Sequence, residues 1–341
     1  MNEILLDGIS VSNHLSHSSL SALSVSPQYF LKYKRRELDR DSKAFDLGSA
    51  IHCYMFEFTA FHNRYVISPS NPVGGMMGIF IESYVEAEDT MINENMPEKL
   101  KLDGYLTLHE LCYDKSGFKT ALETVLKKFN SDENQAYYKF LKENLGKTVL
   151  SQDDMNTILA CHASILKHEK ATSLIFPGTG DRKPEFEISW IYKKVDVKSI
   201  IDNLILDVEN KKVYIVDLKT TSKSVYNFER SYNTYGYYRQ MAIYKLAVHS
   251  YLEKLGINLQ DYDISSYIVV VQTTGLHECV VYKPDSLDLS IGIDEFDGLV
   301  HKYKWHVNND QWDFPMEYYN NNGIINLKLS DEHISRIKEN C

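Results

Sequence analysis

The sequence predicts an α/β protein with a mixed central β-sheet flanked by helices. Three segments rich in β-branched and aromatic residues follow one another at 184–192, 195–207 and 212–220, and this composition is typical of strands. Apolar side chains at helical spacing precede them, and helical and strand patterns alternate after them. A helix, three strands, a helix and a further strand in this order predict an α/β core.

The part of the chain before these strands is predicted to be mainly helical. Ser26 precedes Pro27, the usual arrangement of an N-cap followed by proline in the first helical turn. Residues 44–61 and 151–176 carry apolar side chains at three- and four-residue steps, as amphipathic helices do. The stretch 71–147 lies between them and is interpreted as an inserted helical subdomain.

The later elements are predicted in the same way. The polar stretch 207–212 predicts a hairpin turn between the second and third strands. A long helix is expected over 226–255, and Gly256 suits the position that follows a helix end. The remaining predicted elements are two strands and a helix, at 266–273, 278–282 and 285–305.

The composition excludes several classes of protein. Of 341 residues, 43% are hydrophobic, 16 are glycine and 8 are proline, which excludes collagen-like and wholly disordered chains. No apolar run approaches the roughly 18 residues that span a bilayer, and the first residues lack the pattern of a signal peptide. Five scattered cysteines form neither a disulfide framework nor a CxxC metal pair. We therefore expect a cytoplasmic protein without membrane contact.

The charge balance bears on nucleic-acid binding. Lysine and arginine number 37 against 47 aspartate and glutamate, so the net charge is −10, which argues against a protein that coats nucleic acid non-specifically. An enzyme that acts on DNA is compatible with this balance, because it can gather carboxylates around a metal and keep its basic surface local.

Two carboxylates and a lysine form the group with the clearest chemistry. Side chains alternate along a strand, so Asp217 and Lys219 emerge on one face near the end of the third strand. The hairpin would bring Asp202 alongside from the second strand. Oxygen ligands of this kind suit Mg²⁺ or Mn²⁺, and such a metal can activate water and neutralise charge on a phosphoryl group.

An isolated Asp-x-Lys triplet is more often an ordinary strand end than a catalytic site. Here the triplet follows the apolar run 213–216. Such runs usually belong to buried central strands, where charged groups are rare unless they are paired or bind a metal. The context therefore favours a functional role.

Five stretches of the sequence, in the same order as in a known family, carry a resemblance to that family. Two precede the predicted strands: 15–29, with LSHSSL and SPQY, and 46–57, with DLGSAIHCYMFE. The other three are 185–190, with EFEISW, 198–221, with KSIID and IVDLKTT, and 235–244, with YGYYRQMAIY. Together they resemble the PD-(D/E)XK nuclease superfamily, in its exonuclease VIII branch of phage-type recombination exonucleases. The resemblance covers most of residues 12–70 and 145–285. It implies a restriction-endonuclease-like core.

The resemblance implies a role for each matching residue. Asp202 and Asp217 match the paired metal-binding carboxylates, and the backbone carbonyl of Leu218 would be a further ligand. Lys219 matches the lysine that orients or activates the attacking water and steadies the phosphoryl charge. His52 matches a histidine that adds a metal ligand, with a histidine packed in the core as the alternative.

Glu185 and Gln240 complete the predicted catalytic group, and Tyr244 is a candidate for a contact to DNA or to a metal-binding carboxylate. Glu185 stands where the family has an acidic residue on the first core strand, and Glu187 is a competing candidate. Gln240 and Tyr244 are one helical turn apart, so both can contact one substrate or one metal-binding carboxylate. Ordinary helix packing is the alternative for this pair.

Basic residues provide candidates for contacts to DNA. They are Lys198, four residues before the site aspartate, and Arg35 and Arg36 in a local basic stretch. A solvated helix end is the alternative interpretation of that stretch. The family often has a second basic residue at the position of Ile200, so one such charge is missing here.

The resemblance implies a Mg²⁺-dependent DNA exonuclease, with Mn²⁺ able to substitute and no iron–sulfur cluster. It would degrade the 5′ strand of duplex DNA from an end and leave a 3′ overhang for a single-strand annealing protein. A homo-oligomeric ring, trimer or tetramer, is expected. The alternatives are an endonuclease or single-strand nuclease on the same core, a catalytically silent DNA-binding or assembly protein, and a hydrolase of small phosphate esters.

The predicted domain organisation has four parts. They are an N-terminal helical part of the nuclease domain with the histidine motif at 1–70, a helical insertion of unassigned role at 71–147, the nuclease core at 148–310 and a C-terminal tail at 311–341.

Overall fold

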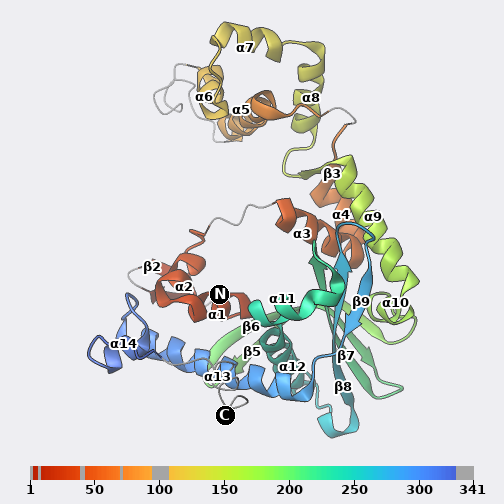
Figure 1. The fold of residues 1–341 in the computed structure, drawn as a ribbon, viewed down its shortest axis with the longest axis vertical. Helices are drawn as coiled ribbons and strands as arrows, with labels where there is room; N and C mark the ends of the chain where they lie inside the picture. The colour runs from red at the N-terminus through yellow and green to blue at the C-terminus, as the bar shows by residue number, and fades with distance from the viewer. Residues whose placement is uncertain (1–2, 7–8, 39–42, 70–71, 94–106, 328–341) are drawn as a thin grey trace, which may run out of the picture. The chain divides into compact units, whose positions relative to one another are not determined.

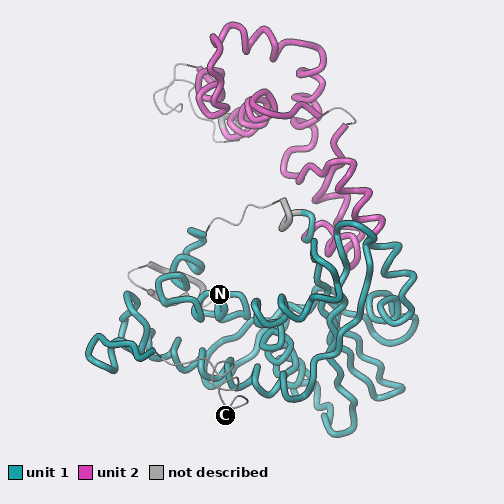
Figure 2. The backbone as a smooth tube through the Cα atoms, in the orientation of Figure 1, with its two compact units in different colours: residues 1–48, 161–341 teal, residues 49–160 magenta. Residues whose placement is uncertain are grey.

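The computed structural model describes residues 3–6, 9–38, 43–69, 72–93 and 107–327 (Figure 1). The chain divides into two compact units (Figure 2), residues 1–48 with 161–341 as the first unit and residues 49–160 as the second. Parts of the predicted insertion and tail, residues 94–106 and 328–341, lie outside the described residues.

The first unit is built on a five-stranded mixed sheet. Its strands follow the order β5-β6-β7-β8-β9, with β7 and β8 parallel and the other neighbouring pairs antiparallel. The predicted fold class is therefore confirmed, as are the predicted strands and the hairpin between the second and third. The strands are β5 (Asp181–Tyr192), β6 (Val195–Asp207), β7 (Lys212–Thr221), β8 (Asp263–Gln272) and β9 (Cys279–Tyr282).

The register of β6 and β7 sets the geometry of the predicted site. Asp207 pairs with Lys212 next to the turn, and Asn203 pairs with Val216 farther along. One step beyond that pair, Asp202 and Asp217 lie on neighbouring strands. The hairpin thus brings together two carboxylates that are fifteen residues apart in the sequence.

Helices cover both faces of this sheet (Figure 1). Helices α12 (Tyr237–Lys254) and α13 (Ser286–Asn309) bury apolar side chains against one face. On the other face lies α10 (Glu169–Ile175), where the buried Asn203 side chain donates a hydrogen bond to the Leu174 carbonyl at 2.7 Å. This coverage explains why the central strands are continuously apolar.

The N-terminal helices α1 (His17–Val25) and α2 (Pro27–Lys34) belong to the same unit. The Ser26 side chain accepts a hydrogen bond from the Tyr29 amide, with proline in the first turn, as predicted. Remaining elements of the first unit are β1 (Glu3–Leu6), β2 (Ile9–Ser12), η2 (Val225–Asn227), α11 (Phe228–Thr234), η3 (Leu259–Asp261) and α14 (Met316–Asn320).

Three stretches predicted as continuous helices are broken, and one of them, 151–176, divides at His168 into α9 (Gln152–Lys167) and α10. The prediction of one helix over 226–255 was wrong, because the chain turns at Gly236, whose φ of 64° is a left-handed conformation that suits glycine. The helical stretch 44–61 divides at Glu57 into α3 (Lys43–Phe56) and α4 (Phe58–Arg64). Apolar spacing alone does not register such breaks, because it continues through them.

The second unit is mainly helical and has its own small core, which includes Phe80, Ile81, Val125 and Phe129. In the described part of the chain, no helix combines the length and apolar character that crossing a membrane requires. The other elements that lie wholly or partly in this unit are β3 (Tyr65–Ile67), α5 (Gly75–Asn93), α6 (Leu108–Ser116), α7 (Leu122–Phe129), α8 (Asp132–Glu143), β4 (Thr148–Leu150) and α9 (Gln152–Lys167).

Candidate active site

Asp217 and Lys219 form a buried ion pair near the end of β7. Strand alternation puts both side chains on one face, and the Lys219 Nζ lies 3.0 Å from Oδ1 and 2.8 Å from Oδ2 of Asp217. The Asp217 side chain is 1% exposed and that of Lys219 is 17% exposed. A charge pair this buried is stable only when each member keeps its partner.

Helix α12 supplies the side chains that hold Asp217 in place. The Gln240 Nε2 donates to Asp217 Oδ1 at 3.0 Å and lies 2.8 Å from the Tyr244 hydroxyl oxygen. The helical spacing of Gln240 and Tyr244 puts both on the face that meets the sheet. The structure thus brings together Asp217, Lys219, Gln240 and Tyr244, all singled out from the sequence.

The electrostatics keep Lys219 cationic. Burial by itself would lower the pKa of its ammonium, but the charges of Asp217 and Asp202 outweigh burial and raise that pKa above its usual value. Burial, and then the same two carboxylates, raise the pKa of the Tyr244 hydroxyl well above its usual value. At neutral pH the site therefore holds a protonated lysine and a neutral tyrosine.

Asp202 lies opposite this pair on β6. Its side chain is buried, and its Oδ2 accepts a hydrogen bond from the Leu218 amide at 2.7 Å. Burial raises the pKa of the Asp202 carboxyl above its usual value, although Lys219 and the Leu218 amide act in the opposite direction. Asp202 and Asp217 are the two carboxylates predicted to bind the metal, and of these Asp202 forms a hydrogen bond to the backbone of β7.

Three residues offer a set of metal-ligand atoms. His52, Glu185 and Asp202 each provide one such atom, and these atoms all lie within 4.8 Å of one another. His52 is one turn beyond Gly48 on α3, and a Cβ at Gly48 would come within 3.2 Å of the Thr220 hydroxyl oxygen at the end of β7. Close passage of α3 past β7 therefore depends on a small residue at position 48.

The donor set fits a hard divalent cation. Two ligands on opposite sides of a Mg²⁺ ion are at most about 4.2 Å apart, since each bond is about 2.1 Å long. Donor atoms within 4.8 Å of one another need only a small adjustment to reach that spacing. The two carboxylates are ligands that suit Mg²⁺ and Mn²⁺, whereas the imidazole of His52 is a ligand more typical of transition-metal ions.

Glu185 and Glu187 have different surroundings in the structure. Glu185 has a φ of 46°, and the strand pairing passes from Pro184↔Asn203 to Phe186↔Ile201 without pairing Glu185 itself. Its carboxylate belongs to the group with Asp202. Glu187 instead forms an ion pair with Lys198 at 2.7 Å.

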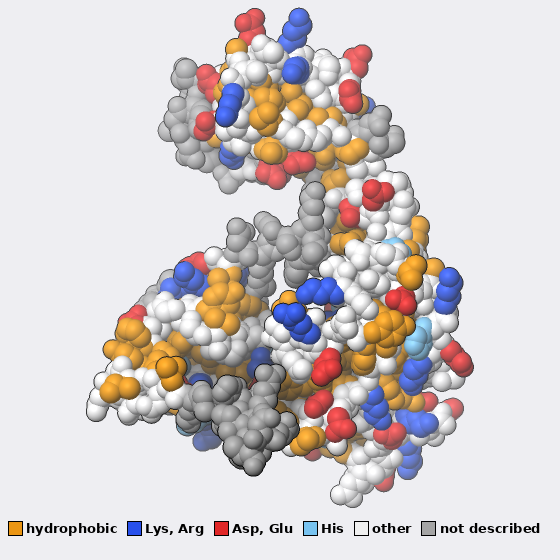
Figure 3. Space-filling view, viewed as in Figure 1, with side chains coloured by type: hydrophobic (Ala, Val, Ile, Leu, Met, Phe, Trp, Pro, Cys, Tyr) orange, Lys and Arg blue, Asp and Glu red, His pale blue; other side chains and the backbone are white. Residues whose placement is uncertain are grey.

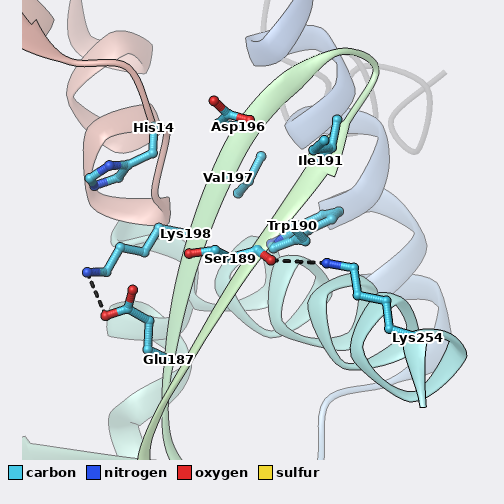
Figure 4. Close-up of a pocket in the computed structure, with 9 residues that line it drawn as sticks. All are labelled: His14, Glu187, Ser189, Trp190, Ile191, Asp196, Val197, Lys198 and Lys254. Carbon is cyan, nitrogen blue, oxygen red and sulfur yellow. Dashed lines mark hydrogen bonds and ion pairs between the residues drawn. The ribbon is translucent and has the colours of Figure 1, made fainter. Parts of the chain in front are cut away.

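The Glu187–Lys198 pair lines a separate cavity of about 380 Å³ on the β5–β6 hairpin (Figure 4). His14 lies on one side of it, and the Lys254 Nζ donates to the Ser189 carbonyl on the other. Lys198 is thus half-buried beside the Glu187 carboxylate. For Lys198 to contact DNA as predicted, Glu187 would have to move away, or its repulsion of the phosphate would have to be smaller than the attraction by Lys198.

The other predicted basic contacts lie where α2 ends. Arg35 follows the last residue of the helix and is half-buried, whereas Arg36 is exposed with a φ of 60°. Their neighbour Lys34 donates to the His14 carbonyl at 2.8 Å, and burial lowers its pKa to about 8. The roles of both arginines in binding DNA remain predictions.

Two side chains beside the site were missed in the sequence. The Lys219 Nζ lies 4.8 Å from the centre of the Tyr237 ring, within the range of a cation–π interaction. His17 is half-buried, the charges of Lys219 and Arg239 act on its pKa, and its Nε2 is 3.2 Å from the Gly236 carbonyl oxygen. Both residues lie inside the matched stretches, but neither has a spacing that singles it out.

Glu57, the last residue of the matched stretch that contains His52, lies between α3 and α4. It forms an ion pair with Arg64, with 2.6 Å between Oε2 and Nη1. Its carboxylate is therefore engaged within the second unit.

Comparisons with solved structures show distant likenesses. A protein from Eubacterium rectale, provisionally described as an exonuclease, is 9% identical with a TM-score of 0.45 over 95% of this chain and 93% of that one. The protein SSO0001 is 10% identical with a TM-score of 0.26 over 74% of this chain and 84% of that one. A search of curated proteins finds no match.

The sequence also matches a known family over most of its length. Residues 16–318 match the family described as a PDDEXK-like domain of unknown function (DUF3799). This range includes the whole mixed sheet and every residue of the candidate site. The chain belongs to this PDDEXK-like family and has the restriction-endonuclease-like fold of PD-(D/E)XK nucleases.

Proposed function

We propose that this protein is a Mg²⁺-dependent DNA exonuclease that hydrolyses phosphodiester bonds from duplex ends. The observation that carries the proposal is the buried group of Asp202, Asp217 and Lys219, held by hydrogen bonds to Leu218 and Gln240. Membership of a PDDEXK-like family supports a nuclease. A purely structural sheet would not favour keeping three charged groups in its interior.

Lys219 acts as a fixed cation in this proposal. Because the neighbouring carboxylates raise its pKa, it is protonated at neutral pH before a cation binds them. Its ammonium can donate to a non-bridging phosphoryl oxygen or orient the attacking water, and charge that develops on the phosphate is then stabilised electrostatically.

In this proposal the carboxylates would hold the metal. His52, Glu185 and Asp202 would bind the cation, with Asp217 and the Leu218 carbonyl as the further ligands expected from the resemblance. When bound, the cation supplies Lewis acidity and lowers the pKa of a coordinated water. Gln240 fixes the Asp217 carboxylate, and Tyr244 fixes Gln240. Attack in line with the leaving oxygen would release a 3′-hydroxyl and a 5′-phosphate.

The finer features of the proposal follow the resemblance of the sequence. They are degradation of the 5′ strand, a 3′ overhang passed to a single-strand annealing protein, and a trimeric or tetrameric ring. A ring would repeat a modest basic patch around the DNA, which helps a chain with a net charge of −10 to bind phosphates.

The experiment is digestion of a linear duplex labelled at either the 5′ or the 3′ end, with Mg²⁺ or with EDTA. The matched controls are the Lys219→Ala variant and a closed circular duplex. Metal-dependent loss of the 5′-labelled strand, absent in the variant and sparing the circle, is the expected result. Cutting of the circle would establish an endonuclease instead.

The same experiment addresses the other functional classes. Cleavage of a small phosphodiester but not of DNA would favour a phosphate-ester hydrolase. Binding of DNA without cleavage, together with a biological effect that survives Asp202→Ala, would identify a catalytically silent DNA-binding protein.

A further inference from the structure

A groove runs beside helix α11, directly after the strand that carries Lys219. It consists of two adjoining cavities of about 260 Å³ and 600 Å³, both of which are lined by Tyr226 and Glu229. We call this feature the α11 groove. Neither the family resemblance nor the proposed reaction assigns it a role.

The smaller cavity is aromatic. Tyr226, Phe228, Tyr232 and Tyr282 line it, and the rings of Phe228 and Tyr282 are stacked with centroids 5.7 Å apart. The carboxylates of Glu229 and Asp288 and the ammonium of Lys283 also line it, and Asp288 accepts a hydrogen bond from Tyr232 at 3.2 Å. A flat conjugated ring that carries N–H donors suits such a cavity, because its faces can stack while its edge donates to carboxylates.

The larger cavity is basic and polar. Lys223 and Arg230 line it, together with the amides of Asn227 and Asn233. Figure 3 shows lysine and arginine side chains gathered over α11 on this face of the molecule. These groups suit a phosphate, which a guanidinium and an ammonium bind through charge-assisted hydrogen bonds.

Aromatic contacts connect the α11 groove to the candidate active site. Lys219 lies over the Tyr237 ring at 4.8 Å. The Tyr237 ring in turn stacks on Phe228, with centroids 5.6 Å apart and planes 10° apart, and Phe228 lines the aromatic cavity. Tyr237 thus contacts Lys219 on one side and Phe228, which lines the groove, on the other.

We propose that the α11 groove binds an unpaired nucleotide of a single DNA strand next to the cleavage site. The base would occupy the aromatic cavity, and the phosphate would lie against Lys223 and Arg230. The nucleotide must be unpaired, because a base inside a duplex is already stacked and paired and cannot enter a side-chain cavity. This inference rests on the proposed nuclease function. A free nucleotide has the same chemistry, so the experiment must distinguish the two sources.

The test measures binding without cleavage. Fluorescence anisotropy of a labelled single-stranded oligodeoxynucleotide is recorded with the full chain in EDTA. Tyr226→Ala and Arg230→Ala are each expected to raise the Kd at least fivefold, whereas Tyr226→Phe, which keeps the ring, stays within twofold. The Tyr226 side chain is 66% exposed, so its removal leaves the core intact.

Two controls make the result specific. Lys212→Ala removes an exposed positive charge at the opposite end of β7 and is expected to leave the Kd within twofold. Lys219→Ala is expected to slow cleavage of linear duplex about 10²–10³-fold while single-strand binding persists. Loss of the proposed nuclease function and loss of groove binding are thereby separate outcomes.

Two results would overturn the assignment. One is an unchanged Kd for both Tyr226→Ala and Arg230→Ala. The other comes from a competition experiment, in which free dAMP or dTMP displaces the labelled strand. If the free nucleotide displaces it at the same concentration of nucleotides as an unlabelled oligonucleotide does, the groove binds a free nucleotide. Competition only at concentrations at least a hundredfold higher supports the single strand.

Discussion

At the scale of single residues, the candidate site is organised around one buried cation. Lys219 contacts both oxygens of Asp217 and lies over the ring of Tyr237. Two carboxylates raise its pKa, so the ammonium is fixed in both position and charge before substrate arrives. Preorganised charge of this kind stabilises a transition state without reorganisation at the moment of reaction.

Replacing Lys219 tests this role directly. Lys219→Ala should lower kcat on a linear duplex by about 10²–10³-fold, the usual effect of removing one preorganised donor. Steady-state digestion with Mg²⁺ measures it, and Lys212→Ala at the other end of β7 serves as the control. A kcat within tenfold of the parent protein would show that Lys219 does not stabilise the phosphoryl charge.

Gln240 is predicted to position a metal-binding carboxylate rather than to react. Removing its hydrogen bond to Asp217 should raise the Mg²⁺ concentration for half-maximal activity about 10- to 100-fold in Gln240→Ala, as losses of groups that orient metal ligands do. A Mg²⁺ titration measures the effect, with the exposed Gln260→Ala as the control. Identical titration curves would assign Gln240 to helix packing alone.

His17 makes stability depend on pH. Burial, reinforced by Arg239 and Lys219, lowers the pKa of its imidazole from 6.5 to about 3. Between these values the unfolded chain binds a proton that the folded chain does not, so the free energy of unfolding falls as pH falls through this window.

His17→Gln should therefore reduce the loss of stability between pH 7 and pH 5. Urea unfolding at the two pH values measures the difference, and His301→Gln, at an exposed histidine, is the control. Equal losses in the parent and His17→Gln proteins would show that His17 titrates alike in the folded and unfolded chains.

At the scale of elements, one hairpin and one broken helix assemble the site. The β6–β7 hairpin brings Asp202 to Asp217, and helix α12 brings Gln240 to the same carboxylate. The break at Gly236 lets α11 and α12 take different directions, so that Phe228 can stack on Tyr237. The turn is therefore as important to the α11 groove as the residues that line it.

Gly236→Ala tests the turn, with Gly256→Ala as its matched control. Both glycines have positive φ, 64° and 72°, but a Cβ at Gly236 would lie 3.0 Å from Arg239 Nη2. A Cβ at Gly256 would have no atom of the described residues within 4 Å, apart from its neighbours in the chain. Left-handed strain alone costs about 1–2 kcal/mol, so Gly256→Ala should lose about that much stability. Gly236→Ala should lose more in urea unfolding; an equal or smaller loss would show that Arg239 yields freely.

At the scale of the whole molecule, the chain comprises two compact units with separate cores. The first contains the mixed sheet, and the second contains the helical stretch whose role the sequence left unassigned. The negative net charge of −10 makes DNA binding depend on local basic groups or on their repetition across subunits.

The predicted oligomer can be measured directly. Light scattering coupled to size-exclusion chromatography should give a mass three or four times that of the chain, because a ring of subunits would place several basic patches around one duplex. A concentration series separates a stable ring from weak association. A monomeric mass at all concentrations would contradict the ring and leave DNA binding to one subunit.

By itself the sequence determined the fold class, the core strands and the group around Asp217. Strand alternation put Asp217 and Lys219 on one face, and helical spacing put Gln240 and Tyr244 together, because both periodicities are local properties of the backbone. The resemblance pointed to His52 and Asp202, whose possible ligand atoms lie within 4.8 Å of each other. Their catalytic roles remain predictions.

Only the tertiary structure decided between Glu185 and Glu187. Both lie on one strand, and spacing does not show which carboxylate faces Asp202. Glu185 has a positive φ and lies outside the β5–β6 register, and its carboxylate stands with Asp202, while Lys198 engages Glu187. The stack from Lys219 through Tyr237 to Phe228 was likewise beyond the sequence. Local patterns set which face a side chain takes, but long-range packing sets which distant side chain it meets.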